Sequence, residues 1–194
     1  LPLLLLAALC ALASQTAHAA PAARPNVLLF FTDDQQADTI AALGNPHIQT
    51  PNLDRLARNG VSFRRAYMMG GLQGATCVPS RAMLLSGQPL FRIDEKLMRH
   101  ETWPAAFGRA GYTTFMSGKW HNGVPSLPLS FQRAGAVFTG GMTNPMQAKL
   151  SRLENGKVTP AELSKEHACA AFADSAVAFL REKHDQPFLC YIPF

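Results

Sequence analysis

The stretch VLLFFTDD, residues 27–34, decides the class of fold. Its first six residues form an unbroken apolar run of strand length, which is typical of a strand buried on both faces of a sheet. Two carboxylates, Asp33 and Asp34, follow at once. Because ligands of α/β sheets bind beyond the carboxyl ends of the strands, the stretch predicts a buried strand and a binding site at its end.

Helix and strand patterns alternate along the rest of the chain. Thr50 and Pro51 favour the start of a helix that Gly60 ends. The further expected elements are a helix that Thr102 precedes and Gly111 ends, a strand over residues 112–116, a helix from the capping box Thr159-Pro160-Ala161-Glu162 to about Lys183, and a strand over residues 188–192. This order predicts an α/β fold with a mixed, largely parallel sheet flanked by helices. Residues 122–158, rich in Gly, Pro and Ser, are expected to form a long surface excursion.

Composition excludes several classes of protein. The 194 residues hold 18 Lys and Arg against 13 Asp and Glu, a net charge of +5, and 47% of them are hydrophobic. Such a chain is too apolar to be disordered and long enough to bury a core. The basic residues form no cluster, so no nucleic-acid partner is expected. The 4 Cys include no C-x-x-C pair that would indicate structural zinc.

The two ends of the chain carry patterns of their own. Residues 1–13 are apolar and uncharged, and Ala17-His18-Ala19 fits the small residues that precede a signal-peptidase cut. We therefore interpret residues 1–19 as the signal peptide of an exported protein, which meets a membrane only through this export signal. Residues 188–194, FLCYIPF, resemble a buried strand without a polar tail. Residues 20–194 are accordingly expected to be the N-terminal portion of a longer, truncated domain.

The pair Asp33 and Asp34 is a candidate cation site. Adjacent carboxylates repel each other unless a cation or a proton lies between them, and oxygen ligands suit Ca²⁺ or Mg²⁺. A solvated turn or a helix cap is the alternative for the pair taken alone. The residues Lys119 and His121 follow another strand and would face one pocket if the backbone there is extended. A cation and a near-neutral base suit an anionic ester, although each residue alone also fits an ordinary surface position.

The element Cys77-Val78-Pro79-Ser80-Arg81 is the sharpest feature. A loop-like stretch precedes it and a helix-like run with a stop at Gly87 follows it, so Cys77 is expected at a helix N-terminus, where the backbone favours negative charge. Arg81 lies one turn further and can return toward the same point. Of the other cysteines, Cys169 on a helix face and Cys190 in a strand are expected to be core thiols, which an exported protein could also pair.

Together these motifs resemble the N-terminal half of the formylglycine-dependent sulfatases, within the alkaline-phosphatase-like superfamily. The resemblance covers about residues 24–123. The matching elements are Arg24-Pro25-Asn26-Val27 leading to Asp33-Asp34, Thr50-Pro51-Asn52-Leu53-Asp54-Arg55-Leu56-Ala57, Cys77-Val78-Pro79-Ser80-Arg81 with Ser86-Gly87, Gly111-Tyr112-Thr113-Thr114, and Gly118-Lys119-Trp120-His121.

The resemblance implies a sulfatase mechanism for the parent protein. Cys77 would be oxidised to formylglycine by a maturation enzyme that reads Pro79 and Arg81, and its hydrate would attack a sulfate ester. The metal ligands would be Asp33, Asp34 and residue 77, holding Ca²⁺ rather than Mg²⁺. The catalytic residues would be Cys77, Arg81, which holds the hydrate, Lys119, which neutralises developing charge, and His121, which acts as the base.

Several alternatives stay open at this point. A phosphonate monoester hydrolase or a phosphodiesterase shares the C-x-P-S-R nucleophile, and a non-catalytic exported fragment would keep the fold without turnover. Family members also carry a second metal-binding pair and a later Lys and His, which have no counterpart here. The resemblance therefore implies that the 194 residues alone hold part of a metal site and lack useful activity. The sulfated substrate, aryl or carbohydrate, is not readable from the sequence.

Overall fold

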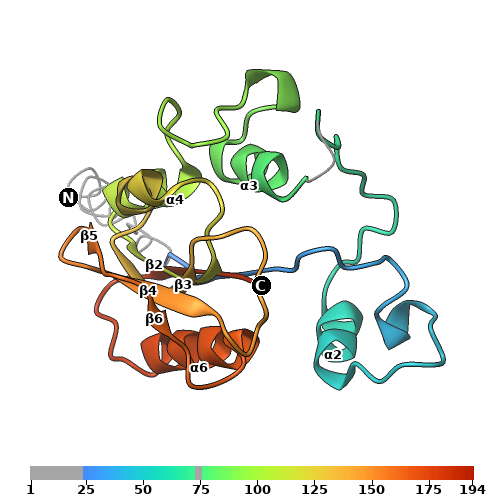
Figure 1. Cartoon of the computed structure of the whole chain (residues 1–194). Coiled ribbons are helices and arrows are strands. Elements are labelled where there is room, and N and C mark those ends of the chain that lie inside the picture. The colour runs from blue at the N-terminus through green and yellow to red at the C-terminus, as the bar shows by residue number, and fades with distance from the viewer. Residues whose placement is uncertain (1–23, 73–75) are drawn as a thin grey trace, which may run out of the picture.

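The computed structural model describes residues 24–72 and 76–194, and the expected signal peptide lies outside these residues. One mixed sheet of 7 strands forms the centre, in the order β1-β7-β2-β3-β4-β5, with β6 paired to β4 (Figure 1). Its strands are β1 (Val27–Phe31), β2 (Thr113–Lys119), β3 (Arg133–Phe138), β4 (Lys149–Glu154), β5 (Lys157–Val158), β6 (Glu162–Leu163) and β7 (Phe188–Pro193). The run β1-β7-β2-β3 is parallel, and β4 with its partners is antiparallel. The predicted mixed, largely parallel sheet is confirmed.

Helices cover both faces of this sheet (Figure 1). The helices of the described residues are α2 (Pro51–Asn59), α3 (Cys77–Ser86), α4 (Trp103–Arg109), α5 (Leu127–Ser130) and α6 (Ala168–Leu180), with short 3₁₀ turns η1 (Ala41–Leu43), η2 (Leu90–Arg92) and η3 (Val124–Ser126). Of these helices, α2 packs on η1 and lies apart from the sheet. Side chains alternate along the strands, so that Phe115 of β2 packs with Phe179 of α6, while the next residue, Met116, packs with Leu85 of α3. The strands thereby join two hydrophobic clusters. In the part of the chain that the structure describes, no helix is long and apolar enough to cross a membrane.

Strand β1 differs from its prediction on one face. It pairs with β7 alone and therefore lies at the edge of the sheet. Leu28 and Phe30 are 43% and 50% exposed, whereas Leu29 and Phe31 pack against the core. The expectation of burial on both faces is wrong for the described residues, because no helix of this part of the chain covers the outer face of β1.

The predicted surface excursion over residues 122–158 is also wrong. This stretch contains η3, α5 and the strands β3, β4 and β5. Its small residues have a packing role, since a Cβ at Gly135 of β3 would lie 1.7 Å from the Ser175 Oγ of α6. Gly135 thus lets α6 approach the sheet. Because glycine is not apolar in the usual pattern, it also weakens the alternation that would have predicted β3.

The last helix begins later than its capping box predicts. Thr159 donates its backbone N–H to the Arg152 carbonyl at 2.8 Å, so the pairing with β4 continues to residue 159. α6 starts at Ala168 instead, where Nδ1 of the capping residue His167 accepts a hydrogen bond from the Cys169 backbone N–H. Cys169 is exposed, so its expected place in the core is wrong, whereas the buried place of Cys190 is confirmed.

Candidate active site

Three chain segments reach one point at the carboxyl edge of the parallel strands. β1 ends at Phe31 and places Asp33 and Asp34 in the turn that follows, where Asp34 adopts a left-handed φ of 48°. β2 runs to Lys119 and delivers His121 two residues later. The third segment is α3, whose first residue is Cys77, as predicted.

The local sequence explains why α3 begins and ends where it does. The Thr76 carbonyl accepts the Ser80 backbone N–H at 3.0 Å, which closes the first turn, and Pro79 lies in that turn where its missing N–H costs nothing. Gly87 ends the helix in the left-handed region at φ 65°. Cys77 therefore lies at the positive end of the helix dipole, where an anion is stabilised.

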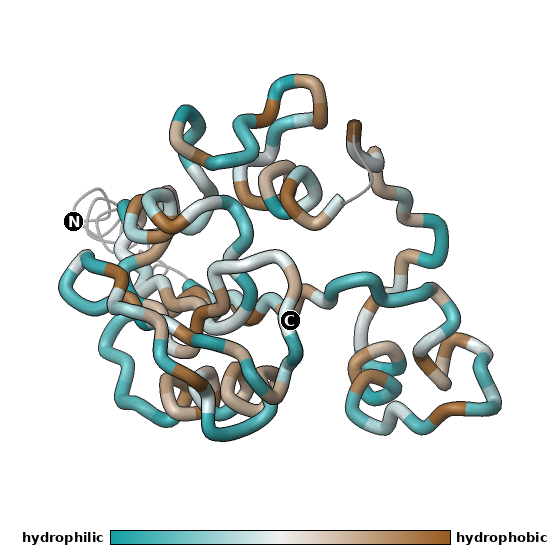
Figure 2. Tube along the Cα trace, in the orientation of Figure 1, coloured by the Kyte–Doolittle hydropathy of each residue, from teal (hydrophilic) through white to brown (hydrophobic). Residues whose placement is uncertain are grey.

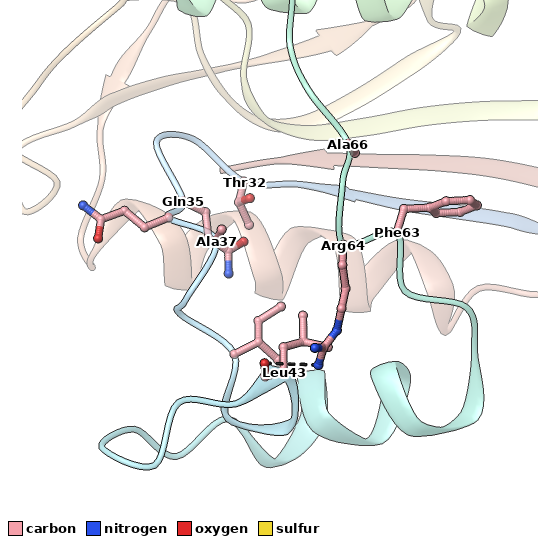
Figure 3. Close-up of a pocket in the computed structure, with 9 residues that line it drawn as sticks. Thr32, Gln35, Ala37, Leu43, Phe63, Arg64 and Ala66 are labelled. Atoms are coloured by element: carbon pink, nitrogen blue, oxygen red, sulfur yellow. Dashed lines mark hydrogen bonds between the residues drawn. The ribbon is translucent and has the colours of Figure 1, made fainter.

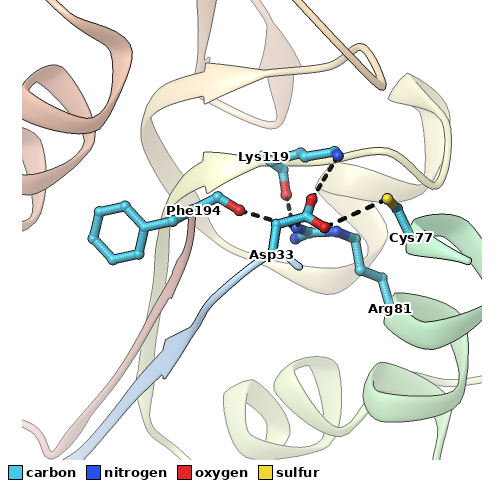
Figure 4. Close-up of polar contacts among 5 residues, drawn as sticks. All are labelled: Asp33, Cys77, Arg81, Lys119 and Phe194. Atoms are coloured by element: carbon cyan, nitrogen blue, oxygen red, sulfur yellow. Dashed lines mark hydrogen bonds and ion pairs between the residues drawn. The ribbon is translucent and has the colours of Figure 1, made fainter. Parts of the chain in front are cut away.

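Asp33 is the centre of the site (Figure 4). Its Oδ2 accepts hydrogen bonds from Lys119 Nζ at 2.6 Å and from an Arg81 Nη at 3.1 Å, while the Cys77 Sγ lies 3.5 Å from its Oδ1. These side chains come from β1, α3 and β2, which are distant in the sequence. The structure thus brings four of the predicted site residues into direct contact, although none of the motifs alone shows that they meet.

Arg81 is a buried residue that joins helix α3 to the sheet as well as carrying a positive charge. Only 1% of Arg81 is exposed, and its guanidinium lies 5.3 Å from the centre of the Phe31 ring. Its two Nη atoms also donate to the backbone carbonyls of Lys119 at 3.0 Å and of Phe194 at 3.1 Å. Arg81 thereby ties α3 to the ends of β2 and β7, and this fixes the Cys77 side of the site against the sheet.

Burial and charge set the protonation of the site. Burial raises the pKa of Asp33, but the hydrogen bonds and charges of Lys119 and Arg81 outweigh it and hold that pKa below its ordinary value. For His121, burial and the same two cations all lower the pKa of the imidazole. Near pH 7 the site therefore combines an ionised Asp33 with a neutral His121, which is able to accept a proton.

His121 lies beside this cluster and makes no hydrogen bond with it among the described residues. Its Nδ1 is buried without a partner in the same part of the chain. The ring packs against Gly141, where a Cβ would lie 2.5 Å from the ring atoms Cε1 and Nε2. The loop after β3 therefore fixes the place of the imidazole.

The acidic residues fit part of a divalent cation site. Asp33, Asp34 and Cys77 each offer a ligand atom, and these atoms lie within 4.8 Å of one another. Two carboxylates suit a hard cation such as Ca²⁺, which takes about six to eight oxygen ligands. A sulfur is a poor ligand for Ca²⁺, whereas an oxygen at residue 77 would complete a set of three hard donors.

Two cavities adjoin at the end of β1. One of about 240 Å³ is lined by Asp33, Asp34, Met68, Cys77 and Arg81 among others. A larger one of about 720 Å³ shares Thr32 and Gln35 with it and extends toward Phe63 and Arg64 (Figure 3). None of the predicted catalytic side chains lines the larger cavity, whereas Cys77 and Arg81 line the smaller one.

Two contributors to the site lack a signal of their own in the sequence. Asn122 donates a hydrogen bond to the carbonyl of Val78, the residue after Cys77, and the Phe194 carbonyl accepts from Arg81. The acceptor in each contact is a backbone carbonyl, which every residue has, so the sequence gives no signal for these contacts. The position of Asn122 directly after His121 is the one hint that the sequence holds.

The comparison with protein families agrees with this geometry. A family model described as Sulfatase matches residues 25–194. The chain belongs to the sulfatase family. Among curated sulfatases, it is 30% identical over 177 residues to an N-acetylglucosamine-6-O-sulfatase of Bacteroides thetaiotaomicron, covering 85% of this chain and 29% of the relative. It is 37% identical over 126 residues to the arylsulfatase A of Bos taurus, covering 59% of this chain and 24% of the relative.

Solved sulfatase structures share the fold. The structure of a putative sulfatase from Bacteroides fragilis superimposes with a TM-score of 0.73 at 18% sequence identity, covering 88% of this chain and 43% of the neighbour. The present sulfatase chain thus spans less than half the length of the relatives and of the neighbour that it matches.

Proposed function

We propose that this chain carries the nucleophile half of a sulfuric ester hydrolase that acts on an aryl or carbohydrate sulfate. The observation that carries the proposal is the contact of Cys77 with Asp33, 3.5 Å apart, at a helix N-terminus and beside the cations Arg81 and Lys119. Relatives named for a carbohydrate sulfatase and for an arylsulfatase support this substrate class. Positive groups around a transferring sulfuryl group stabilise the charge that develops on it.

The proposed nucleophile is a formylglycine made from Cys77. In its hydrate, the oxygen of one hydroxyl attacks the sulfur of the ester and gives up its proton to solvent. The S–O bond to the alcohol breaks, and the leaving oxygen takes a proton from solvent. His121 then takes the proton of the second hydroxyl, whose oxygen forms the carbonyl again while the C–O bond between residue 77 and the sulfate breaks and sulfate leaves. A serine or a thiol lacks this second hydroxyl and would need water for the release.

The other residues hold and polarise the reacting groups. Asp33 and Asp34, with the oxygen of residue 77, would hold Ca²⁺, which polarises the sulfate oxygens when bound. Lys119 is 8% exposed and directs its ammonium to the same place, so it would neutralise charge on the sulfate or the diol. Arg81 would hold the hydrate in line with the ester.

Burial constrains the proposed maturation. Pro79 and Arg81, the residues that the maturation enzyme would read, are both buried in folded α3. Oxidation of Cys77 would therefore precede folding, while the motif is still accessible. This order suits a protein that is exported, as the proposed signal peptide over residues 1–19 predicts.

The test uses the whole protein that contains this chain, co-expressed with a formylglycine-generating enzyme. An aryl sulfate, an aryl phosphonate and a set of sulfated sugars are assayed in parallel. Sulfate release that Cys77→Ala abolishes and Cys169→Ala preserves would support the proposal, because Cys169 is an exposed thiol away from the site. Turnover of the phosphonate alone would replace it with a phosphonate hydrolase, and no turnover at all would favour the non-catalytic alternative.

A further inference from the structure

Asn122 links the segment that carries Lys119 and His121 to the first turn of α3, which carries Cys77. It is 1% exposed and directly follows His121. Its Nδ2 donates hydrogen bonds to the carbonyls of Val78 at 3.0 Å and of Glu95 at 2.7 Å, so the amide reaches two separate stretches of backbone. An amide buried in this way is held in one orientation by its partners.

The Val78 carbonyl belongs to the first turn of α3, one residue after Cys77. A second side chain crosses the same gap in the opposite direction, since Arg81 of α3 donates to the Lys119 carbonyl at 3.0 Å. The two hydrogen bonds form a pair of clamps between the first two turns of α3 and residues 119–122. Each clamp ends on a backbone carbonyl, so each fixes the course of the chain as well as a side chain.

We propose that Asn122 is a positioning residue that sets the place of Cys77 relative to Lys119 and His121. Without its amide donors, the Glu95 carbonyl would lose this partner and the Val78 carbonyl would lose its link to residue 122. The first turn of α3 would then open more often, while Arg81 would still hold the rest of the helix. The consequence for catalysis rests on the proposed function, but the geometry of Cys77 does not.

The test measures the alkylation rate of the Cys77 thiol in the full chain, expressed without a maturation enzyme. Iodoacetamide labelling is followed by mass spectrometry of the tryptic peptide over residues 66–81, with the exposed Cys169 as the internal reference. Asn122→Asp keeps the size of the side chain but replaces the donors with an acceptor. We expect it to raise the Cys77 rate at least tenfold relative to Cys169, which corresponds to about 1.4 kcal/mol.

Two controls separate positioning from a general loss of stability. Asn144→Asp makes the same chemical change at an exposed residue and should leave the Cys77 rate unchanged. Leu153→Ala removes a side chain from the core of β4, far from Cys77 in the sequence, and lowers global stability by about 2–5 kcal/mol. If Leu153→Ala raises the Cys77 rate as much as Asn122→Asp does, the role of Asn122 is merely structural and the proposal is overturned.

A second variant covers the case in which Asn122→Asp does not fold. Asn122→Gln keeps the amide donors but moves them by one methylene group, so it should raise the Cys77 rate in the same direction by a smaller factor. A folded Asn122→Gln or Asn122→Asp protein with an unchanged Cys77 rate would overturn the inference. This assay uses the unmodified thiol, so its result does not depend on the proposed function. The proposed function would be contradicted by a different result, namely that Cys77 is never converted to formylglycine.

Discussion

Two segments border the cavity at Asp33, and the chain holds them in different ways. The inner segment, from Cys77 to Asn122, is tied to the sheet by buried polar side chains such as Arg81 and Lys119. The outer segment, residues 35–72, packs α2 mainly on η1, apart from the sheet (Figure 1). The inner segment carries Cys77, the proposed nucleophile, whereas the outer segment lines the cavities with more exposed residues such as Met68 and Phe63.

The hydropathy of the outer segment sharpens this contrast. Figure 2 shows apolar residues in its connection from α2 to α3, and several of these side chains are exposed. The largest of these exposed side chains are Val61, Phe63, Tyr67, Met68, Met69 and Leu72. The polar contacts of α2 stay within the segment, since Asp54 accepts the Ala42 backbone N–H at 2.9 Å and the Thr50 hydroxyl at 2.8 Å. The outer segment is therefore held mainly by contacts among its own residues, whereas the inner segment is held by contacts with the sheet.

Glycine substitutions give the largest expected difference between the segments. Gly118 of β2 has φ 137°, and a Cβ there would lie 1.8 Å from the Pro193 carbonyl oxygen, which is backbone and does not yield. Gly44 of the outer segment has φ 119° and open space around its Cβ position. We expect Gly118→Ala to cost more than about 4 kcal/mol of unfolding free energy and Gly44→Ala about 1–2 kcal/mol from backbone strain alone. Equal losses in urea unfolding would remove the contrast.

Loss of an arginine is expected to have the next largest effect. Arg81→Met removes three hydrogen bonds from a side chain that is 1% exposed, whereas Arg58→Met breaks a surface pair with Asp54 whose atoms lie 4.0 Å apart. We expect the first to cost about 3 kcal/mol, because Asp33 and two carbonyls lose a buried partner, and the second less than about 0.5 kcal/mol. Chemical denaturation of both variants measures these losses. A loss of unfolding free energy below about 1 kcal/mol for Arg81→Met would contradict the stabilising role of Arg81.

The smallest expected effect is the pH dependence of stability. The pKa of Asp33 is lowered against the effect of burial by Lys119 and Arg81, and the pKa of Asp54 is lowered chiefly by the Ala42 backbone hydrogen bond and then by Thr50. Each carboxylate binds fewer protons in the folded state, so each contributes stability above the unfolded pKa of about 3.9. This stability is lost as pH falls through the lower folded pKa.

Asparagine variants distinguish the two causes. An amide at residue 54 still accepts hydrogen bonds, so Asp54→Asn should stay close to the wild type near pH 6. An amide at residue 33 lacks the charge that its cations require, so Asp33→Asn should be less stable there and should change less on acidification. Urea midpoints between pH 6 and 2.5, in the presence of a chelator, measure both curves. A wild-type midpoint for Asp33→Asn near pH 6 would mean that Lys119 and Arg81 do not stabilise the carboxylate.

About half of the helices and strands could be predicted from the sequence because these elements have strong local signals. Pro51 and Gly60 bracket α2, Gly87 ends α3, and apolar runs mark β1, β2 and β7. Strands β3 to β6 could not be found in this way. Their residues alternate weakly, and Gly135 is small for the sake of the α6 contact. The capping box over residues 159–162 gave the wrong start for the last helix, because Glu162 lies in β6, which pairs with β4. No local sequence pattern indicates this long-range pairing.

The candidate site shows the same division. The positions of Cys77, Lys119 and Asp33 at the ends of helices and strands follow from the sequence, since the ends of parallel strands share one edge. The clamps of Arg81 and Asn122 end on carbonyl oxygens of distant residues, so they depend on the folded chain and not on a motif.

The most direct test of the account is the mass of the tryptic peptide Ala66–Arg81, from protein co-expressed with a formylglycine-generating enzyme. The account predicts an aldehyde or its hydrate at residue 77, with the sulfur replaced by oxygen. Because the maturation motif is buried in α3, the conversion should occur during expression and should be absent when folded protein is treated afterwards. An unmodified Cys77 thiol, with the same enzyme active on a control peptide, would contradict the proposed nucleophile.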